Sequence, residues 1–315
     1  MTRRIVLLGP QRDRQTVAAA VADLGVAGPL AIVTAGWEER DAEDTELREH
    51  LGQPVAALGL WPRAEQVFHA DPEVRALLYE RYDRLRALQE LYRLRLGPEL
   101  AACRALYART DPEAPDALHG PEIEHAIEGV RRLDAHHLER TQELDLEIFG
   151  RIDAAKRPSL ARHRAEIARA LRRAEALLIA GGHVGILLNR LRLFGVLEMA
   201  SELPIVAWSG GAMVLTERIV LFHDSPPQGP GDAEVYARGA GLVRGVVPLP
   251  HAVQRLKLDD PARVALFARR FAPDLCAALD AGERLDGTQA GDAWTLADGA
   301  RRLSPDGRVT TEVAA

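Results

Sequence analysis

The stretch Ala207-Trp208-Ser209-Gly210-Gly211-Ala212-Met213 follows directly on an apolar run at residues 203–206. This order is typical of a serine held at a sharp turn between a strand and a helix. Such a nucleophile elbow needs a small residue two positions before the serine and a glycine two positions after it, because both positions pack against neighbouring backbone. Ala207 and Gly211 meet this requirement. The hydroxyl would lie beside a helix N-terminus, where backbone N–H groups can stabilise an oxyanion, so the stretch predicts a serine hydrolase.

Two later segments supply the partners that a serine nucleophile needs. Residues 218–222 are expected to form a strand that leads to Asp224, and residues 239–250 form a second apolar segment that leads to His251. Open α/β sheets carry their chemistry at such strand ends. A serine hydroxyl is a poor nucleophile at neutral pH, so it needs an imidazole base that a carboxylate orients. Ser209, His251 and Asp224 are therefore the predicted catalytic residues.

Two alternatives affect this assignment. His223 could replace His251 as the base, but it adjoins Asp224, and neighbours on a strand face opposite sides. Asp224 could instead be a turn residue that precedes two prolines. We retain His251 as the base and Asp224 as the orienting acid.

Four segments together resemble the peptidase E and cyanophycinase family of serine peptidases, which has a class I glutamine amidotransferase-like fold. They are residues 178–188, the Ser209 elbow, residues 223–226 and residues 241–251. Asp224 follows the serine by 15 positions, in the family's order of catalytic residues. The resemblance implies cleavage of a small peptide or amide through an acyl-enzyme on Ser209, with no metal and no organic cofactor.

The resemblance also implies where the oxyanion would bind. Its donors would be the N–H of Gly210 and the turn formed by Gly181 and Gly182. Gly210 replaces the family's usual alanine, and His183 replaces a usual asparagine, so the family's preference for aspartyl substrates is not carried over. His183 is a predicted substrate-binding residue for this reason. Arg255 is another, because it lies near the predicted base and an arginine can hold a carboxylate bidentately.

The first sixty residues predict the start of a parallel sheet. Short apolar runs at residues 4–9, 30–34 and 55–60 alternate with helical patterns at residues 15–24 and 42–51. This βαβαβ order is typical of an α/β fold. With the resemblance it predicts a three-layer, mostly parallel, flavodoxin-like sheet. The tail, residues 284–313, is expected to form a C-terminal β meander.

The middle of the chain has a different character. Apolar residues recur at helical spacing from residue 72 and again at residues 121–151, with a proline-containing loop at residues 110–116 between them. A third helix is expected at residues 159–174. We therefore predict an α/β catalytic domain, residues 1–71 and 174–315, into which a helical hairpin, residues 72–173, is inserted. The hairpin could be a lid or a homodimerisation arm, but the interpretation we prefer is that its helices pack on each other and on the sheet.

Composition excludes several classes of protein. The chain has 315 residues, 47% hydrophobic and 27% charged, which is ordinary for a globular protein. The net charge of −6 and the lack of a long basic run argue against nucleic acid as a partner. No segment approaches the roughly 20 apolar residues of a membrane span, so we expect a cytoplasmic protein. Its two cysteines, Cys103 and Cys276, do not suggest a disulfide framework.

Two adjacent histidines are a candidate metal site. The adjacent His136 and His137 would point about 100° apart on a helix, so they do not form a chelating face, and no metal is expected. Amidotransferase activity is disfavoured because the family's glutaminases use cysteine where this chain has Ser209. The alternative function is that of a noncatalytic binding or assembly protein that uses the helical hairpin.

Overall fold

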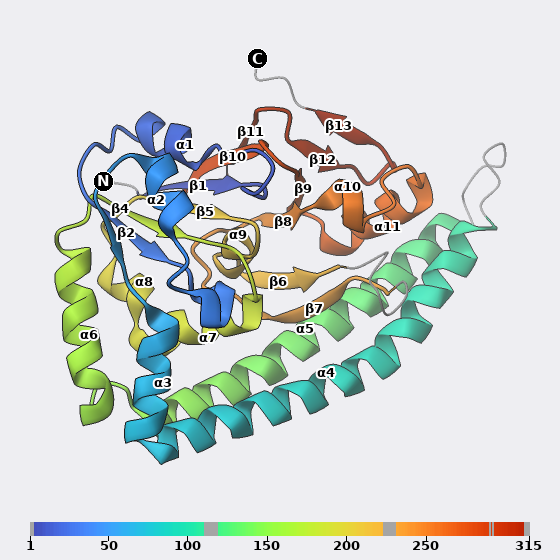
Figure 1. Cartoon of the computed structure of the whole chain (residues 1–315). Coiled ribbons are helices and arrows are strands. Elements are labelled where there is room, and N and C mark those ends of the chain that lie inside the picture. The colour runs from blue at the N-terminus through green and yellow to red at the C-terminus, as the bar shows by residue number, and fades with distance from the viewer. Residues whose placement is uncertain (1–2, 110–118, 223–230, 290, 292, 312–315) are drawn as a thin grey trace.

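The computed structural model describes residues 3–109, 119–222, 231–289, 291 and 293–311. A seven-stranded sheet lies at its centre (Figure 1). In spatial order its strands are β11 (Thr295–Ala297), β10 (Arg284–Thr288), β1 (Arg4–Leu8), β5 (Ile205–Trp208), β4 (Ala176–Ile179), β2 (Leu30–Val33) and β3 (Val55–Ala57). Strands β1 to β5 are parallel, whereas β10 and β11 are antiparallel to their neighbours. The predicted mostly parallel α/β sheet is therefore confirmed.

Helices cover both faces of this sheet. Successive side chains of a strand point to opposite faces, and in β1 the side chains of Val6 and Leu8 pack on one side while those of Ile5 and Leu7 pack on the other. The first face is covered by α1 (Val17–Asp23) and α2 (Thr45–Leu51). The second is covered by α3 (Leu60–Ala70), α6 (Pro158–Leu171) and α7 (Val184–Phe194). The result is three layers, with strands buried on both sides.

The first predicted strands are placed correctly, but the one expected at residues 55–60 is shorter. Strand β3 ends at Ala57, and helix α3, which the sequence did not predict, begins at Leu60. Pro62 lies in the first turn of α3, where its missing N–H costs no hydrogen bond. A short apolar run such as residues 55–60 fits either the end of a strand or the start of a helix. Its periodicity therefore did not show where the strand ends.

The C-terminal tail differs from the expected meander. The pair β10 and β11 extends the main sheet beside β1. A second sheet has the spatial order β13 (Val309–Thr311), β12 (Arg301–Leu303), β9 (Leu275–Leu279) and β8 (Val246–Pro250). The tail thus contributes two hairpins to two sheets. The physical reason is that β1 and β9 each have an open edge whose backbone groups need partners.

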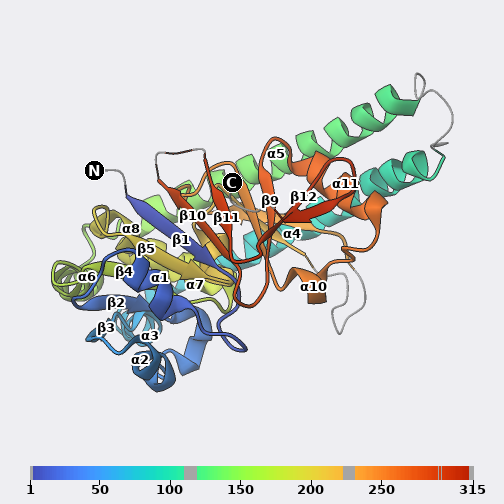
Figure 2. The same ribbon diagram turned by 90° about the horizontal axis from the view of Figure 1, so that it is seen from above.

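Two long helices run side by side along the molecule (Figure 2): α4 (Pro72–Tyr107) and α5 (His119–Ile152). Asp71 caps the start of α4 by accepting a hydrogen bond from the N–H of Val74. The ion pair of Arg84 with Glu147 and the hydrogen bond of Tyr92 to Asp134 show that the helices are antiparallel. Their buried stripes face each other and the elements α3, α11 (Pro261–Phe271) and β7 (Glu234–Arg238). Strand β7 pairs with β6 (Arg218–Leu221) in a separate two-stranded ribbon. The two helices therefore pack on each other, as expected. Their other partners are the β6–β7 ribbon, α3 and α11.

A buried polar cluster joins the hairpin to α11, the helix that packs on the second sheet. The guanidinium of Arg270 in α11 donates to both carboxylate oxygens of Asp134 in α5, at 2.7 and 2.8 Å. The hydroxyl of Tyr92 in α4 donates to Asp134 at 2.7 Å and accepts from Arg270 at 2.8 Å and from the N–H of Val235 at 3.2 Å. Burial by itself lowers the pKa of Arg270, but the charge of Asp134 outweighs burial and the pKa is raised. The guanidinium of Arg270 therefore stays protonated inside the protein, paired with the carboxylate of Asp134.

No helix in the described ranges is long and apolar enough to cross a membrane.

Candidate functional site

Ser209 lies at a strained turn between β5 and α9 (Gly210–Val214). Its φ of 50° and ψ of −123° are in a region that non-glycine residues rarely adopt, at a cost of about 1–3 kcal/mol. The residues on either side of it are buried, whereas Ser209 itself is partly exposed. A Cβ on Gly211 would lie 2.3 Å from the carbonyl oxygen of Ile179, which explains the need for glycine there. The expected elbow geometry is present.

A glycine turn after β4 lies directly against this elbow. A Cβ on Gly181 would lie 2.9 Å from the Cβ of Ser209 and 3.0 Å from the backbone nitrogen of Gly210. Gly182 has a φ of 108° and lies against Gly36. Within the described part of the chain, the N–H groups of Gly181, Gly182 and Gly210 donate to no acceptor. These donors therefore remain available near the serine.

The same closeness accounts for glycine at position 210. A Cβ on Gly210 would lie 2.8 Å from the carbonyl oxygen of Gly182 and 3.1 Å from Cγ2 of Val184. An alanine would therefore require this turn to move away from the elbow.

His251 lies at the C-terminal end of β8 and precedes the short helix α10 (Ala252–Arg255). Its backbone is in the left-handed region, with a φ of 60°, and its N–H donates to the carbonyl of Leu279 at 3.2 Å. Burial and then the charge of Arg255 lower the pKa of the imidazole, while Asp280 and Asp13 oppose this. The lowered pKa leaves the imidazole neutral at neutral pH, as a general base requires.

Of the three predicted catalytic residues, the structure describes Ser209 and His251. The hydroxyl of Ser209 makes no hydrogen bond to His251 or to any other described side chain. Asp224 and the alternative base His223 lie outside the described residues. The triad therefore stays a prediction.

Backbone contacts nevertheless connect the strand ends that carry Ser209 and His251. The N–H of Ser209 donates to the carbonyl of Leu8 at 3.1 Å. The next residue, Gly9, fits so closely against Asp280 that a Cβ on it would lie 1.8 Å from the Asp280 carbonyl oxygen. Asp280 directly follows Leu279, the acceptor for the N–H of His251.

Asp280 is a residue near the site that the sequence analysis missed. Its carboxylate accepts from the N–H of Val253 in α10, at 3.2 Å, and from Arg301 at 2.6 Å, and its charge raises the pKa of His251. The signal available in the sequence was an acid directly after the apolar run at residues 275–279.

The two predicted substrate-binding residues lie at separate places. Nδ1 of His183 accepts from the N–H of Ile186 at 3.2 Å and so caps α7, and the side chain is exposed beside the Gly181 turn. Arg255 is at the end of α10, close enough to His251 for its charge to act on it. Burial lowers the pKa of Arg255, and the guanidinium makes no hydrogen bond to any described residue.

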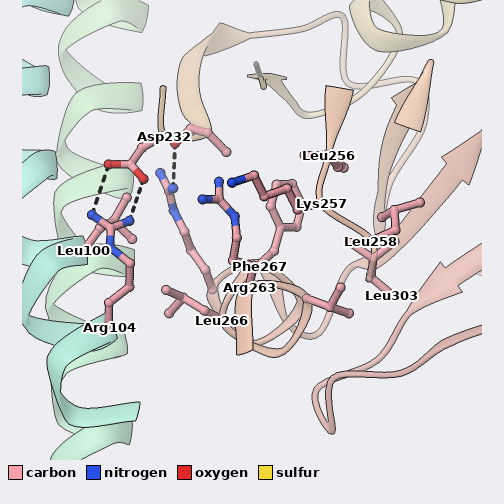
Figure 3. A pocket seen from close by; sticks show the side chains of 13 residues that line it. Leu100, Arg104, Asp232, Leu256, Lys257, Leu258, Arg263, Leu266, Phe267 and Leu303 are labelled. Carbon is pink, nitrogen blue, oxygen red and sulfur yellow. Dashed lines mark hydrogen bonds and ion pairs between the residues drawn. The ribbon is translucent and has the colours of Figure 1, made fainter. Parts of the chain in front are cut away.

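A small pocket lies next to α10 (Figure 3). Its volume is about 60 Å³, and it lies between α4 and α11. Leu256, which follows Arg255, and Phe267 are among the apolar side chains that line it, and an ion pair of 2.6 Å between Arg104 and Asp232 lies at its edge. Ser209 is not a lining residue, so this pocket is not the space around the nucleophile.

In the described ranges, no group of three or more histidine, cysteine, aspartate or glutamate side chains could hold a metal ion.

No protein-family model and no curated protein matches this chain. Among solved structures, it is similar to a peptidase from an acI-B1 Actinobacterium, with 14% sequence identity and a TM-score of 0.49. The alignment covers 97% of this chain and 92% of that chain.

Proposed function

We propose that the chain is a serine hydrolase of the peptidase E and cyanophycinase type, which cleaves a small peptide or amide through an acyl-enzyme on Ser209. The observation that carries the proposal is the strained Ser209 elbow with the unused N–H groups of Gly181, Gly182 and Gly210 around it. Backbone strain is retained where surrounding structure enforces it, and it is concentrated at functional sites.

In this mechanism His251 takes the proton of Ser209 as the hydroxyl attacks the scissile carbonyl. Asp224 orients the imidazole and stabilises the imidazolium. The N–H groups of the glycine turn and of Gly210 bind the oxyanion of the tetrahedral intermediate. His251 then gives its proton to the leaving amine, and water releases the acyl group by the same steps. In this mechanism His183 and Arg255 contact the rest of the substrate.

The proposal is tested by incubating the purified protein with a library of dipeptides and acyl amides, with aspartyl dipeptides included. A fluorophosphonate probe, which labels activated serines, is used in parallel. Turnover and labelling that both depend on Ser209 support the hydrolase. Equal background from the wild type and a Ser209→Ala variant in both assays would contradict it.

The glycine turn gives a separate prediction. Gly181→Ala places a methyl group 2.9 Å from the Cβ of Ser209, so the elbow or the turn must shift. Misplacing reacting groups by up to about 1 Å costs about a hundredfold in rate, which is the fall in kcat that we expect. Gly97→Ala in α4 is the control, because a Cβ there meets nothing within 4 Å. If Gly181→Ala keeps the kcat of the wild type, the turn does not support the reaction.

A change at Arg255 should shift the pH dependence of kcat/KM. The base acts when it is unprotonated, so activity falls as pH drops through the pKa of His251. Arg255 lowers this pKa, and therefore Arg255→Gln should move the acid limb to higher pH. Arg255→Lys keeps the positive charge and should leave the midpoint nearly unchanged. An unmoved midpoint in Arg255→Gln would exclude His251 as the titrating base, whatever the change in the absolute rate.

The alternative proposal is an assembly role for the hairpin as a homodimerisation surface. Three leucines of α4 and α5 support it because they are largely exposed: Leu91, Leu94 and Leu146. Light scattering of the wild type and of a variant with all three changed to glutamine tests it, and a monomeric wild type would rule out the homodimer.

A further inference from the structure

A second residue at this edge of the sheet has almost the same strained backbone as Ser209. Glu38 has a φ of 59° and a ψ of −124°. It lies in the 3-10 turn η1 (Ala35–Arg40), which follows β2. Glycine adopts this conformation without the steric cost that a glutamate incurs. A glutamate at such a position calls for a role of its side chain that outweighs the strain.

The turn that carries Glu38 is held by buried hydrogen bonds. The hydroxyl of Thr34 donates to the carbonyl of Asp41 at 2.9 Å and to its carboxylate at 2.5 Å. The other carboxylate oxygen of Asp41 accepts from the N–H of Trp61 at 2.9 Å. The N–H of Asp41 donates to the carbonyl of Glu38 at 2.9 Å. Thr34 and Asp41 are both buried, so the backbone of Glu38 is fixed in place.

This turn adjoins the proposed oxyanion site. Val33, Ile179 and Ala207 lie in register on the neighbouring strands β2, β4 and β5. Two strand spacings of about 4.8 Å place the end of β2 roughly 10 Å from the end of β5, which leads into Ser209. The carbonyl of Gly36 accepts from the N–H of His183 at 2.7 Å. A substrate held at Ser209 can therefore reach the turn with about three residues of extended backbone or with one long side chain.

The carboxylate of Glu38 is available for a ligand. The residue is partly exposed, and among the described residues its carboxylate accepts no hydrogen bond and forms no ion pair. Arg190 is near, since the charges of Glu65 and Glu38 oppose the lowering of its pKa by burial. Its guanidinium forms an ion pair with Glu65 at 3.8 Å and packs on the rings of Trp61 and Phe68, at 5.2 and 4.9 Å from their centres. Arg190 is thus engaged by Glu65 and the two rings, and among the described residues the carboxylate of Glu38 keeps no ion pair.

We propose that Glu38 is a specificity-determining residue that binds a cationic group of the substrate, either an α-ammonium or the side chain of a lysine or arginine. This inference rests on the proposed function, because it places the cationic group on a substrate whose scissile carbonyl lies at Ser209. A positively charged group on the substrate is a property that the family resemblance does not specify.

The test uses four short peptides that differ in two features: a free or an acetylated α-amine, and a lysine or a norleucine side chain. The loss of one charge-assisted hydrogen bond should lower kcat/KM of Glu38→Gln by about tenfold on the peptides that carry the recognised cation. The matched peptides without it should change less than about twofold. Glu38→Asp, which retains the charge, should keep part of the discrimination. The peptide pair that responds identifies the α-amine or the side chain as the cation.

Glu38→Gly separates a binding role from a structural one. Relief of the backbone strain should raise the midpoint of thermal unfolding by about 2–6 °C, while the preference for the cationic peptide is lost. A Glu38→Gly variant that unfolds at a lower temperature would instead assign Glu38 a structural role and overturn the inference.

The outcomes distinguish this inference from the proposed function. Turnover that depends on Ser209 but is unchanged in Glu38→Gln, or is reduced equally for all four peptides, overturns the inference alone. If no peptide is cleaved, binding is measured instead of kcat/KM. The four peptides are titrated by calorimetry into Ser209→Ala and into the double variant Ser209→Ala with Glu38→Gln. Weaker binding of only the cationic peptides to the double variant supports Glu38 without the hydrolase. Equal or undetectable binding overturns the inference, while the library and probe assays decide the hydrolase separately.

Discussion

Under the proposed function, Ser209→Ala should abolish turnover of the peptide or amide substrate, with kcat reduced by about 10⁴-fold or more. The reason is that the proposed mechanism forms the acyl-enzyme on the Ser209 hydroxyl, so only binding and oxyanion stabilisation remain without it. KM should change much less, because the hydroxyl contributes little to ground-state binding. The measurement is steady-state kinetics on the best library substrate, with mass spectrometry to detect the acyl-enzyme in the wild type.

The control for this change is Ser201→Ala, which removes a hydroxyl from an exposed turn. It should leave kcat and KM unaltered. If Ser209→Ala retains more than about a hundredth of the activity of the wild type, Ser209 is not the nucleophile, because removal of a triad serine costs far more. The assembly role of the hairpin would then be favoured.

Asp134→Ala should produce the largest loss of stability among the changes considered. It would leave the guanidinium of Arg270 buried without its counter-ion and leave the hydroxyl of Tyr92 without an acceptor. Breaking a buried ion pair by removing one partner costs about 3–5 kcal/mol in the free energy of unfolding. Urea unfolding, followed by circular dichroism, measures the loss as a lower midpoint.

Glu143→Ala is the matched control for Asp134→Ala. Glu143 also pairs with an arginine, Arg140, on helix α5, but both side chains are more than half exposed. Exposed ion pairs contribute little, so the unfolding midpoint should hardly move. A similar small effect from Asp134→Ala would mean that water reaches the cluster.

Local patterns in the sequence were sufficient for several parts of the structure. The Ser209 elbow was predictable because its requirements lie within five residues, from Ala207 to Gly211. The start of α4 was predictable because Asp71 and Pro72 are a capping residue and a favourable first helical residue. The core of each parallel strand was predictable because it is a continuous apolar run.

Features that depend on distant segments were not predictable in the same way. The tail was assigned antiparallel strands correctly, but its division between two sheets depends on the open edges of β1 and β9, which no local pattern encodes. The strain at Glu38 depends on the buried contacts of Asp41, and the closeness of Asp280 to His251 depends on the pairing of β8 with β9. The catalytic triad and the family resemblance remain predictions, since Asp224 lies outside the described residues.

The pairing of β1 also has a consequence for synthesis of the protein on the ribosome. Strand β1 lies between β5 and β10, so Ile5 has Ile205 on one side and Gly287 on the other. Strand β1 therefore cannot complete its hydrogen bonds until β10 (Arg284–Thr288) has been made. Contacts between such distant segments slow folding, and the exposed edge of β1 could pair with another chain in the meantime. We expect nascent chains that stall before residue 284 to require chaperones.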